Sequence, residues 1–198
     1  MSIELFLKRY YTVASAVIVL ALLWLTAFGT VSSSTVTVSA TVAESITCST
    51  DQTSTSFGAL TSSAIATSTP NASSTMSCNV GIGCNLSIND SSAGLATSSP
   101  AYTIPTTRGT LSVGTEGYGI IATTTATGSG GALSIKSIYL NNFNGNAVGE
   151  LNTTSTVLAS STASVSNREV VVKHKAAVSG NTQAASYTDT ITYSCTQN

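Results

Sequence analysis

Residues 35–48 read TVTVSATVAESITC, and this stretch indicates the fold class of the chain. Its apolar residues recur at every second position, so they share one face of an extended strand, while Thr and Ser share the other. Threonine suits the polar face because it is β-branched and yet hydrophilic. The sequence therefore predicts a half-buried strand. The apolar positions are Val36, Val38, Ala40, Val42, Ile46 and Cys48.

Similar short runs continue to the end of the chain, and no ten-residue helical pattern appears after residue 31. Stretches rich in Gly, Ser and Asn at 91–100, 127–134 and 141–150 predict exposed loops. Many short strands with turn signals between them favour an all-β fold, an immunoglobulin-like antiparallel β-sandwich, with residues 32–198 as a single domain. Further strands are expected over residues 74–78, 84–88, 101–104, 110–113, 117–124, 134–140, 155–160, 169–178 and 186–195.

An apolar segment precedes this domain, and it predicts one N-terminal hydrophobic helix. Lys8 and Arg9 are followed by no charged residue until Glu44. Two basic residues before an apolar core are typical of a secretion signal, for which Ala27-Phe28-Gly29 is an acceptable cleavage site. Residues 10–31 would also span about 33 Å as a helix, enough to cross a bilayer. Residues 1–31 are thus either a cleaved signal or a retained membrane anchor, and residues 32–198 are expected outside the cytoplasm, at the cell surface.

The composition excludes several classes of function. The chain of 198 residues holds 33 Ser and 33 Thr, but only 8% of its residues are charged, and its net charge is −1. Nucleic-acid binding needs a basic surface, so it is not expected. One His and eight carboxylates are few side chains that could act as a general acid or base. We therefore expect a protein that is not an enzyme, with no cofactor, no metal and no small-molecule substrate.

The four cysteines agree with an oxidising compartment, because all follow the apolar segment and their number is even. In an immunoglobulin-like topology the first two strands are antiparallel, which favours bridges Cys48–Cys78 and Cys84–Cys195. The alternative joins Cys78 to Cys84 across a tight hairpin and Cys48 to Cys195. Zinc is a weaker alternative, because the Cys78-x5-Cys84 spacing is wider than in usual zinc knuckles and His174 is the only imidazole.

The remaining polar candidates have simple structural interpretations. His174 shares a face with Val170 and Val172, so a partly buried structural histidine is expected rather than a catalytic one. Lys173 and Lys175 alternate with it and are expected on a solvated face that protects a strand edge; contact with an anionic glycan is the alternative. Asp189 and Asp90 are expected to make hydrogen bonds at turns or strand ends. Calcium binding by Asp189 is the alternative, but no second carboxylate is close to it in sequence.

Both ends of the exported region resemble the spore-coat-U-like pilin domains of bacteria. The resemblance rests on STVTVSATVAESITCST with SFGAL (56–60), on TMSC ending at Cys78, and on AASYTDTITYSC (184–195). The sequence also resembles small secreted surface proteins of candidate bacterial phyla. The resemblance implies an immunoglobulin-like subunit that polymerises by donating an N-terminal strand to a neighbour.

In this sequence the residues that match the donated strand are Val36, Val38, Ala40 and Val42. The expected partners are therefore other copies of the chain or other surface proteins. Cys84 and Cys195 depart from the family pattern, and a retained anchor would favour a strand that completes its own domain. The alternative function is a monomeric, membrane-tethered adhesin or binding module that uses its exposed loops.

Overall fold

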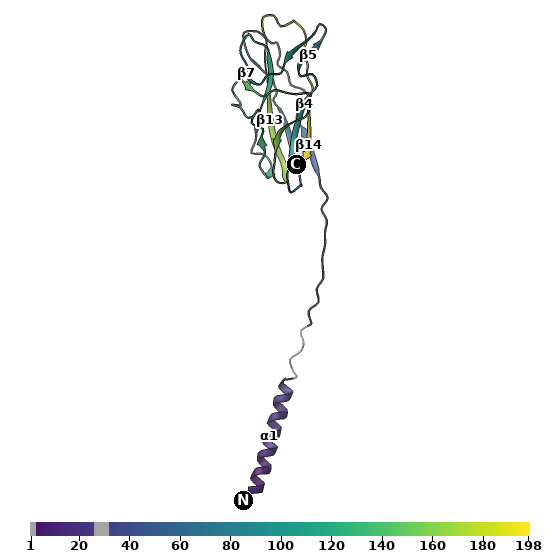
Figure 1. The fold of residues 1–198 in the computed structure, drawn as a ribbon, viewed down its shortest axis with the longest axis vertical. Helices are drawn as coiled ribbons and strands as arrows, with labels where there is room; N and C mark the ends of the chain where they lie inside the picture. Colours follow the sequence, from purple (N-terminus) through teal and green to yellow (C-terminus); the bar gives the residue numbers. More distant parts are fainter. Residues whose placement is uncertain (1–2, 26–31) are drawn as a thin grey trace. The chain divides into compact units, whose positions relative to one another are not determined.

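The structure is a computed structural model that describes residues 3–25 and 32–198. Helix α1 (Ile3–Leu25) confirms the expected N-terminal helix, and the expected cleavage site Ala27-Phe28-Gly29 lies outside the described residues. Within the part of the chain that the structure describes, no helix combines the length and the hydropathy that a membrane crossing requires. Residues 3–42 and 43–198 form two separate units, and the second contains every strand (Figure 1).

The second unit is built from antiparallel sheets, as the alternating sequence predicts. The larger sheet has the order β1-β3-β13-β2, and β8 and β9 also pair with β13. The other large sheet has the order β10-β12-β4-β14. Strands of the larger sheet are β1 (Ile46–Thr50), β2 (Ala66–Thr67), β3 (Ala72–Cys78), β8 (Gly117–Thr124), β9 (Ser129–Gly130) and β13 (Val165–Ala177). Strands of the other are β4 (Cys84–Asp90), β10 (Ser134–Ile135), β12 (Thr156–Ser160) and β14 (Ile191–Gln197).

Two small two-stranded sheets complete the unit. Strand β5 (Gly94–Ser98) pairs with β6 (Ala101–Pro105), and β7 (Gly109–Thr110) pairs with β11 (Ala147–Val148). Strand β5 occupies part of the stretch 91–100, which was expected to be a loop because it is rich in Gly and Ser. Conversely, the strand expected over 186–195 forms only from Ile191 onward.

One hydrophobic core takes side chains from both large sheets. Met76, Ile120 and Val172 come from the larger sheet, and Leu86 and Leu158 come from the other. All five are fully buried. Burial of each such side chain contributes about 1.5–3 kcal/mol, so this core supplies the main free energy of folding.

The Val-rich stretch that indicates the fold class does not itself form a strand over most of its length. Only Ile46 and Cys48 of its apolar positions lie in β1, and residues 32–45 contain no strand. Val36, Val38 and Val42 are 86%, 89% and 83% exposed, and Ala40 is also exposed. The prediction of a half-buried strand over 35–48 is therefore wrong for residues 35–45, because no second strand lies beside them in this chain.

The lysine prediction is wrong as well. Strand β13 pairs with β3 on one side and with β8 on the other, so it is an interior strand and not an edge. Lys175 is only 6% exposed. Its Nζ donates to Asn146 Oδ1 at 3.0 Å, and Lys173 Nζ donates to the Phe143 carbonyl oxygen at 2.9 Å. The two lysines tie the loop before β11 to the sheet.

Candidate functional site

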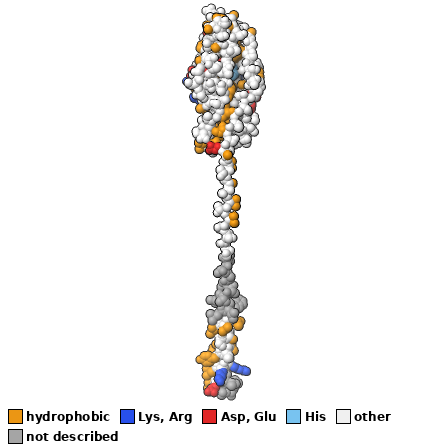
Figure 2. Space-filling view, turned by 90° about the vertical axis from the view of Figure 1, so that its right-hand side faces the viewer, with side chains coloured by type: hydrophobic (Ala, Val, Ile, Leu, Met, Phe, Trp, Pro, Cys, Tyr) orange, Lys and Arg blue, Asp and Glu red, His pale blue; other side chains and the backbone are white. Residues whose placement is uncertain are grey.

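The two large sheets each have an unpaired edge strand, and these two strands lie near each other. Strand β1 pairs only with β3, and β14 pairs only with β4, within residues 32–198. Cys48 of β1 is joined to Cys195 of β14. Figure 2 shows the face that carries β1 and β14, where a band of apolar side chains runs along the surface. An unpaired edge with exposed apolar side chains is an uncommon feature of a soluble domain.

A groove of about 900 Å³ opens along this face. One wall is the segment 52–60, which follows β1, and the other is the segment 182–191, which leads into β14. Hydrogen bonds hold the first wall, since Ser56 N donates to the Thr69 carbonyl oxygen at 3.1 Å. The apolar lining consists of Phe57, Ala59, Leu60, Ala72, Leu95, Val178, Ala184, Ala185, Tyr187, Ile191 and Tyr193.

The second wall is held by a carboxylate. The Tyr102 hydroxyl donates to Glu116 Oε1 at 2.7 Å, and the Thr182 hydroxyl donates to the same oxygen. Ser179 Oγ lies 3.5 Å from it. Tyr187 packs edge-to-face on Tyr102, with ring centroids 6.3 Å apart. Glu116 therefore fixes the loop between β13 and β14, and with it the shape of the groove.

His174 and Tyr118 lie at the floor of the groove. The two side chains stack, and Tyr118 Oη lies 3.0 Å from His174 Nδ1, within hydrogen-bond distance. His174 is 4% exposed, and its burial lowers the pKa of the imidazole to about 4. The ring is therefore neutral near pH 7. A buried structural histidine agrees with the prediction, although the sequence did not indicate its tyrosine partner.

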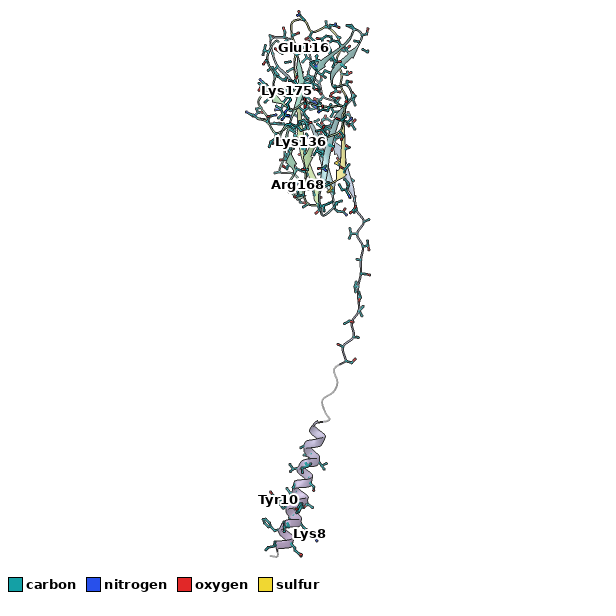
Figure 3. The ribbon with its side chains drawn as sticks, viewed as in Figure 1. Lys8, Tyr10, Glu116, Lys136, Arg168 and Lys175 are labelled. Atoms are coloured by element: carbon teal, nitrogen blue, oxygen red, sulfur yellow. A yellow bond between two sulfur atoms is a disulfide. The ribbon has the colours of Figure 1, made fainter. Side chains whose placement is uncertain are left out.

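Four charged side chains of the domain, Glu116, Lys175, Lys136 and Arg168, are not gathered in one place (Figure 3). Arg168 donates to the carbonyl oxygens of Gly130 and Gly131 at 3.0 and 3.1 Å. Within the described residues there is no group of three or more His, Cys, Asp or Glu side chains that could hold a metal ion.

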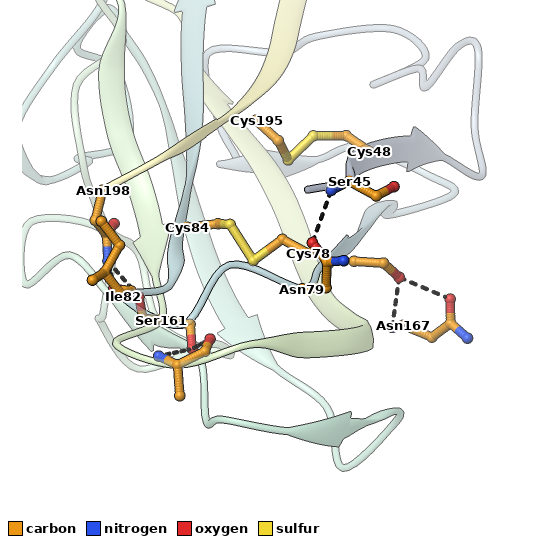
Figure 4. The surroundings of a disulfide bond; sticks show 12 residues. Ser45, Cys48, Cys78, Asn79, Ile82, Cys84, Ser161, Asn167, Cys195 and Asn198 are labelled. Atoms are coloured by element: carbon orange, nitrogen blue, oxygen red, sulfur yellow. Dashed lines mark hydrogen bonds between the residues drawn. A yellow bond between two sulfur atoms is a disulfide. The ribbon is translucent and has the colours of Figure 1, made fainter. Parts of the chain in front are cut away.

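The four cysteines form two disulfides that connect the two large sheets (Figure 4). The bridges are Cys48–Cys195 and Cys78–Cys84, with Cα atoms 6.0 and 6.6 Å apart. Cys78 ends β3 and Cys84 begins β4, so the short connection between them passes from one sheet to the other. Gly83, with a φ of +85°, allows this tight turn, because a side chain is disfavoured in that backbone conformation.

The favoured pairing, Cys48–Cys78 with Cys84–Cys195, is therefore wrong, and the alternative pairing is the one observed. Strand β1 does run antiparallel to β3, but Cys48 lies opposite Met76, so Cys48 and Cys78 are diagonal neighbours on one face of the same sheet. Cys195 and Cys84 are related in the same way, since Cys195 lies opposite Leu86. Side chains stand roughly perpendicular to a sheet. Each sulfur atom consequently meets a cysteine of the facing sheet rather than its lateral neighbour.

Asn79 forms hydrogen bonds with Ala43 and Ser45, which precede strand β1. Its Oδ1 accepts a hydrogen bond from Ser45 N at 2.8 Å, and its Nδ2 donates to the Ala43 carbonyl oxygen at 2.8 Å. These hydrogen bonds hold residues 43–45 next to the start of β1.

No protein family, curated protein or solved structure matches this chain.

Proposed function

We propose that the chain is a secreted or membrane-anchored structural subunit of the cell surface, a pilin-like β-sandwich that assembles by strand addition. Residues 36–42 of one copy enter the groove of the next copy and pair with the free edge of β14. The role is structural, so the proposal includes no catalysis and no cofactor. The resemblance to spore-coat-U-like domains belongs to this proposal.

One observation carries it: the same chain holds an unpaired alternating segment and a partly apolar groove beside the free edge of β14. Val36, Val38 and Val42 are exposed, although exposure of valine to water is unfavourable. In an extended segment these side chains point to one side, as a groove-filling strand requires. Backbone hydrogen bonds to β14 would supply affinity, and the apolar lining would supply specificity.

The lengths agree with this arrangement. Residues 36–42 span about 23 Å when extended, and so do the seven residues of β14. A strand of that length can pair along β14, whose Ile191 and Tyr193 line the groove. Because only residues 43–45 separate this segment from β1, the segment can reach the edge of its own domain only by turning back, antiparallel to β1. A strand from a neighbouring copy has no such constraint.

The direct test changes one inward-facing position and one outward-facing position. In the full-length oxidised protein, Val38→Asp places a charge where the groove would bury it, and we expect assembly measured by light scattering to be lost. Thr37→Asp adds the same charge on the opposite face of the strand, and we expect assembly to continue. Equal assembly by the two variants would contradict strand addition.

A second experiment separates a neighbour's strand from the chain's own strand. A photo-crosslinking residue replaces Val38, and light and ¹⁵N-labelled copies are mixed before irradiation. We expect crosslinks from position 38 to peptides of residues 52–60 or 183–193 that carry the other label. Crosslinks confined to a single label would show that the strand completes its own domain, and the tethered monomeric module would then be the better proposal.

A further inference from the structure

Two aspartates lie near the groove, one at the end of β4 and one on the segment that leads into β14, the strand that pairs with β4. Asp90 ends β4, and Asp189 lies two residues before β14. Asp90 pairs in register with Ile191, so the two aspartates project from the same face of the sheet. Asp90 is 1% exposed, and Asp189 is half-buried and lines the groove.

Both carboxylates bind the turn that follows β4, each through one oxygen. Asp90 Oδ1 accepts hydrogen bonds from Ser92 N at 3.2 Å and from Ala93 N at 2.7 Å. Asp189 Oδ1 accepts from Ser91 N at 3.4 Å and from Ser91 Oγ at 3.2 Å. The two carboxyl groups therefore hold adjacent residues of one turn, Ser91 to Ala93.

Those remaining oxygens, Asp90 Oδ2 and Asp189 Oδ2, are buried and accept no hydrogen bond. A buried carboxylate oxygen without a partner is costly, and two carboxylates that face each other increase the cost. Burial first, and then the negative charge of Asp90, raise the pKa of the Asp189 carboxyl. The site therefore lacks positive charge.

The nearest groups do not supply that charge. His174 is neutral, and Tyr118 beside it is also uncharged, since burial and then the charge of Asp189 raise the pKa of its hydroxyl. Lys173 and Lys175 bind the loop before β11, and Arg168 binds the carbonyl oxygens of residues 130 and 131. None of these side chains therefore supplies a positive charge to the two carboxylates.

We propose that Asp90 and Asp189 bind a calcium ion through their free Oδ2 atoms, with water completing its coordination. Calcium is a hard cation that prefers oxygen ligands and tolerates irregular geometry, whereas zinc prefers nitrogen and sulfur. Two carboxylates form a weak site, for which a Kd of about 10⁻⁴–10⁻³ M is typical in extracellular modules. The ion would tie the turn after β4 to the segment that leads into β14 and would brace one wall of the groove. This inference does not depend on strand addition.

The test measures thermal unfolding of the full-length oxidised protein after treatment with EDTA, in the Val38→Asp background so that strand addition does not contribute. We expect Ca²⁺ to raise the Tm in a saturable way, and the ratio of folded to unfolded protein to rise about elevenfold at ten times the Kd. Mg²⁺ and K⁺ at matched ionic strength should have a smaller effect.

Three variants locate the site. Asp90→Asn and Asp189→Asn keep the oxygen that holds the turn but lose the negative charge, and both should lose the response to Ca²⁺. Asp51→Asn, on the loop after β1, should keep it. The proposal is overturned if the parent protein shows no Ca²⁺-dependent shift or if the shift persists in Asp189→Asn. It is also overturned if the Tm instead rises on acidification from pH 7 to 5 equally with and without Ca²⁺, because a shared proton then replaces the ion.

Discussion

Residues 36–42 and strand β14 have the same alternating pattern but opposite environments. In β14, Ile191, Tyr193 and Cys195 are half-buried, and all seven residues are in register with β4. In the N-terminal segment, Val36, Val38 and Val42 remain exposed and unpaired. The comparison shows that alternation of apolar and polar residues allows a segment to form a strand. Whether the strand forms depends on another strand with a free edge beside it.

Removal of the Cys48–Cys195 bridge should have the largest effect, because it releases β14 from β1. The bridge closes a loop with a sequence separation of 147, and the chain-entropy relation predicts a loss of about 5 kcal/mol for Cys48→Ala with Cys195→Ala. Removal of Cys78–Cys84, with a separation of 6, should cost only about 2 kcal/mol. Urea unfolding of the two double variants measures the difference, and equal losses would contradict the pairing.

His174, at the floor of the groove, should make the free energy of unfolding dependent on pH. The pKa of His174 is lowered from 6.5 to about 4 by burial, so the unfolded chain binds a proton first as the pH falls. Stability is therefore lost between about pH 6.5 and 4, by about 3 kcal/mol. Asp189 acts in the opposite sense, since its pKa is raised by burial.

Urea unfolding of the parent protein and of His174→Gln at pH 7.5, 5.5 and 4 isolates the histidine. Glutamine retains a polar partner for Tyr118 but cannot gain a proton. We expect the variant to lose less stability on acidification than the parent protein. Parallel curves for the two proteins would show that His174 is not buried as described.

Within β14, substitution of an inward-facing residue should destabilise the protein more than substitution of an outward-facing residue. Ile191 packs against the core, so Ile191→Ala should cost about 1–2 kcal/mol, given that the side chain is half-buried. Thr192 is exposed, and Thr192→Ala should change stability by less than about 0.5 kcal/mol. Thermal unfolding compares them, and an equal cost at both positions would mean that β14 has another register.

The smallest effect on stability is expected in the N-terminal segment. Replacing Val36, Val38 and Val42 together by Ser should change the unfolding free energy of a single copy by less than about 0.5 kcal/mol, because these side chains are exposed. Light scattering on the same sample should show loss of assembly. A large destabilisation of the isolated copy would mean that the segment completes its own domain.

Local patterns therefore predicted much of the fold and less of the site. The run GYGIIATT forms β8 over its full length, and the expected strands around Cys78, Cys84 and Val170 are present. The groove could not be predicted, because it depends on which edges remain unpaired. Lys175 was misplaced for the same reason, since at this residue β13 lies between β2 and β8.

The sequence by itself determined the mostly β composition, the N-terminal helix, the two disulfides and the alternating segment at residues 36–42, because each depends on residue type and on spacing along the chain. Only the tertiary structure decided which cysteines pair, which strand edges remain free, and that Asp90 and Asp189 meet at one turn. These features depend on contacts between residues that are far apart in sequence, and the period of a strand contains no information about its partner.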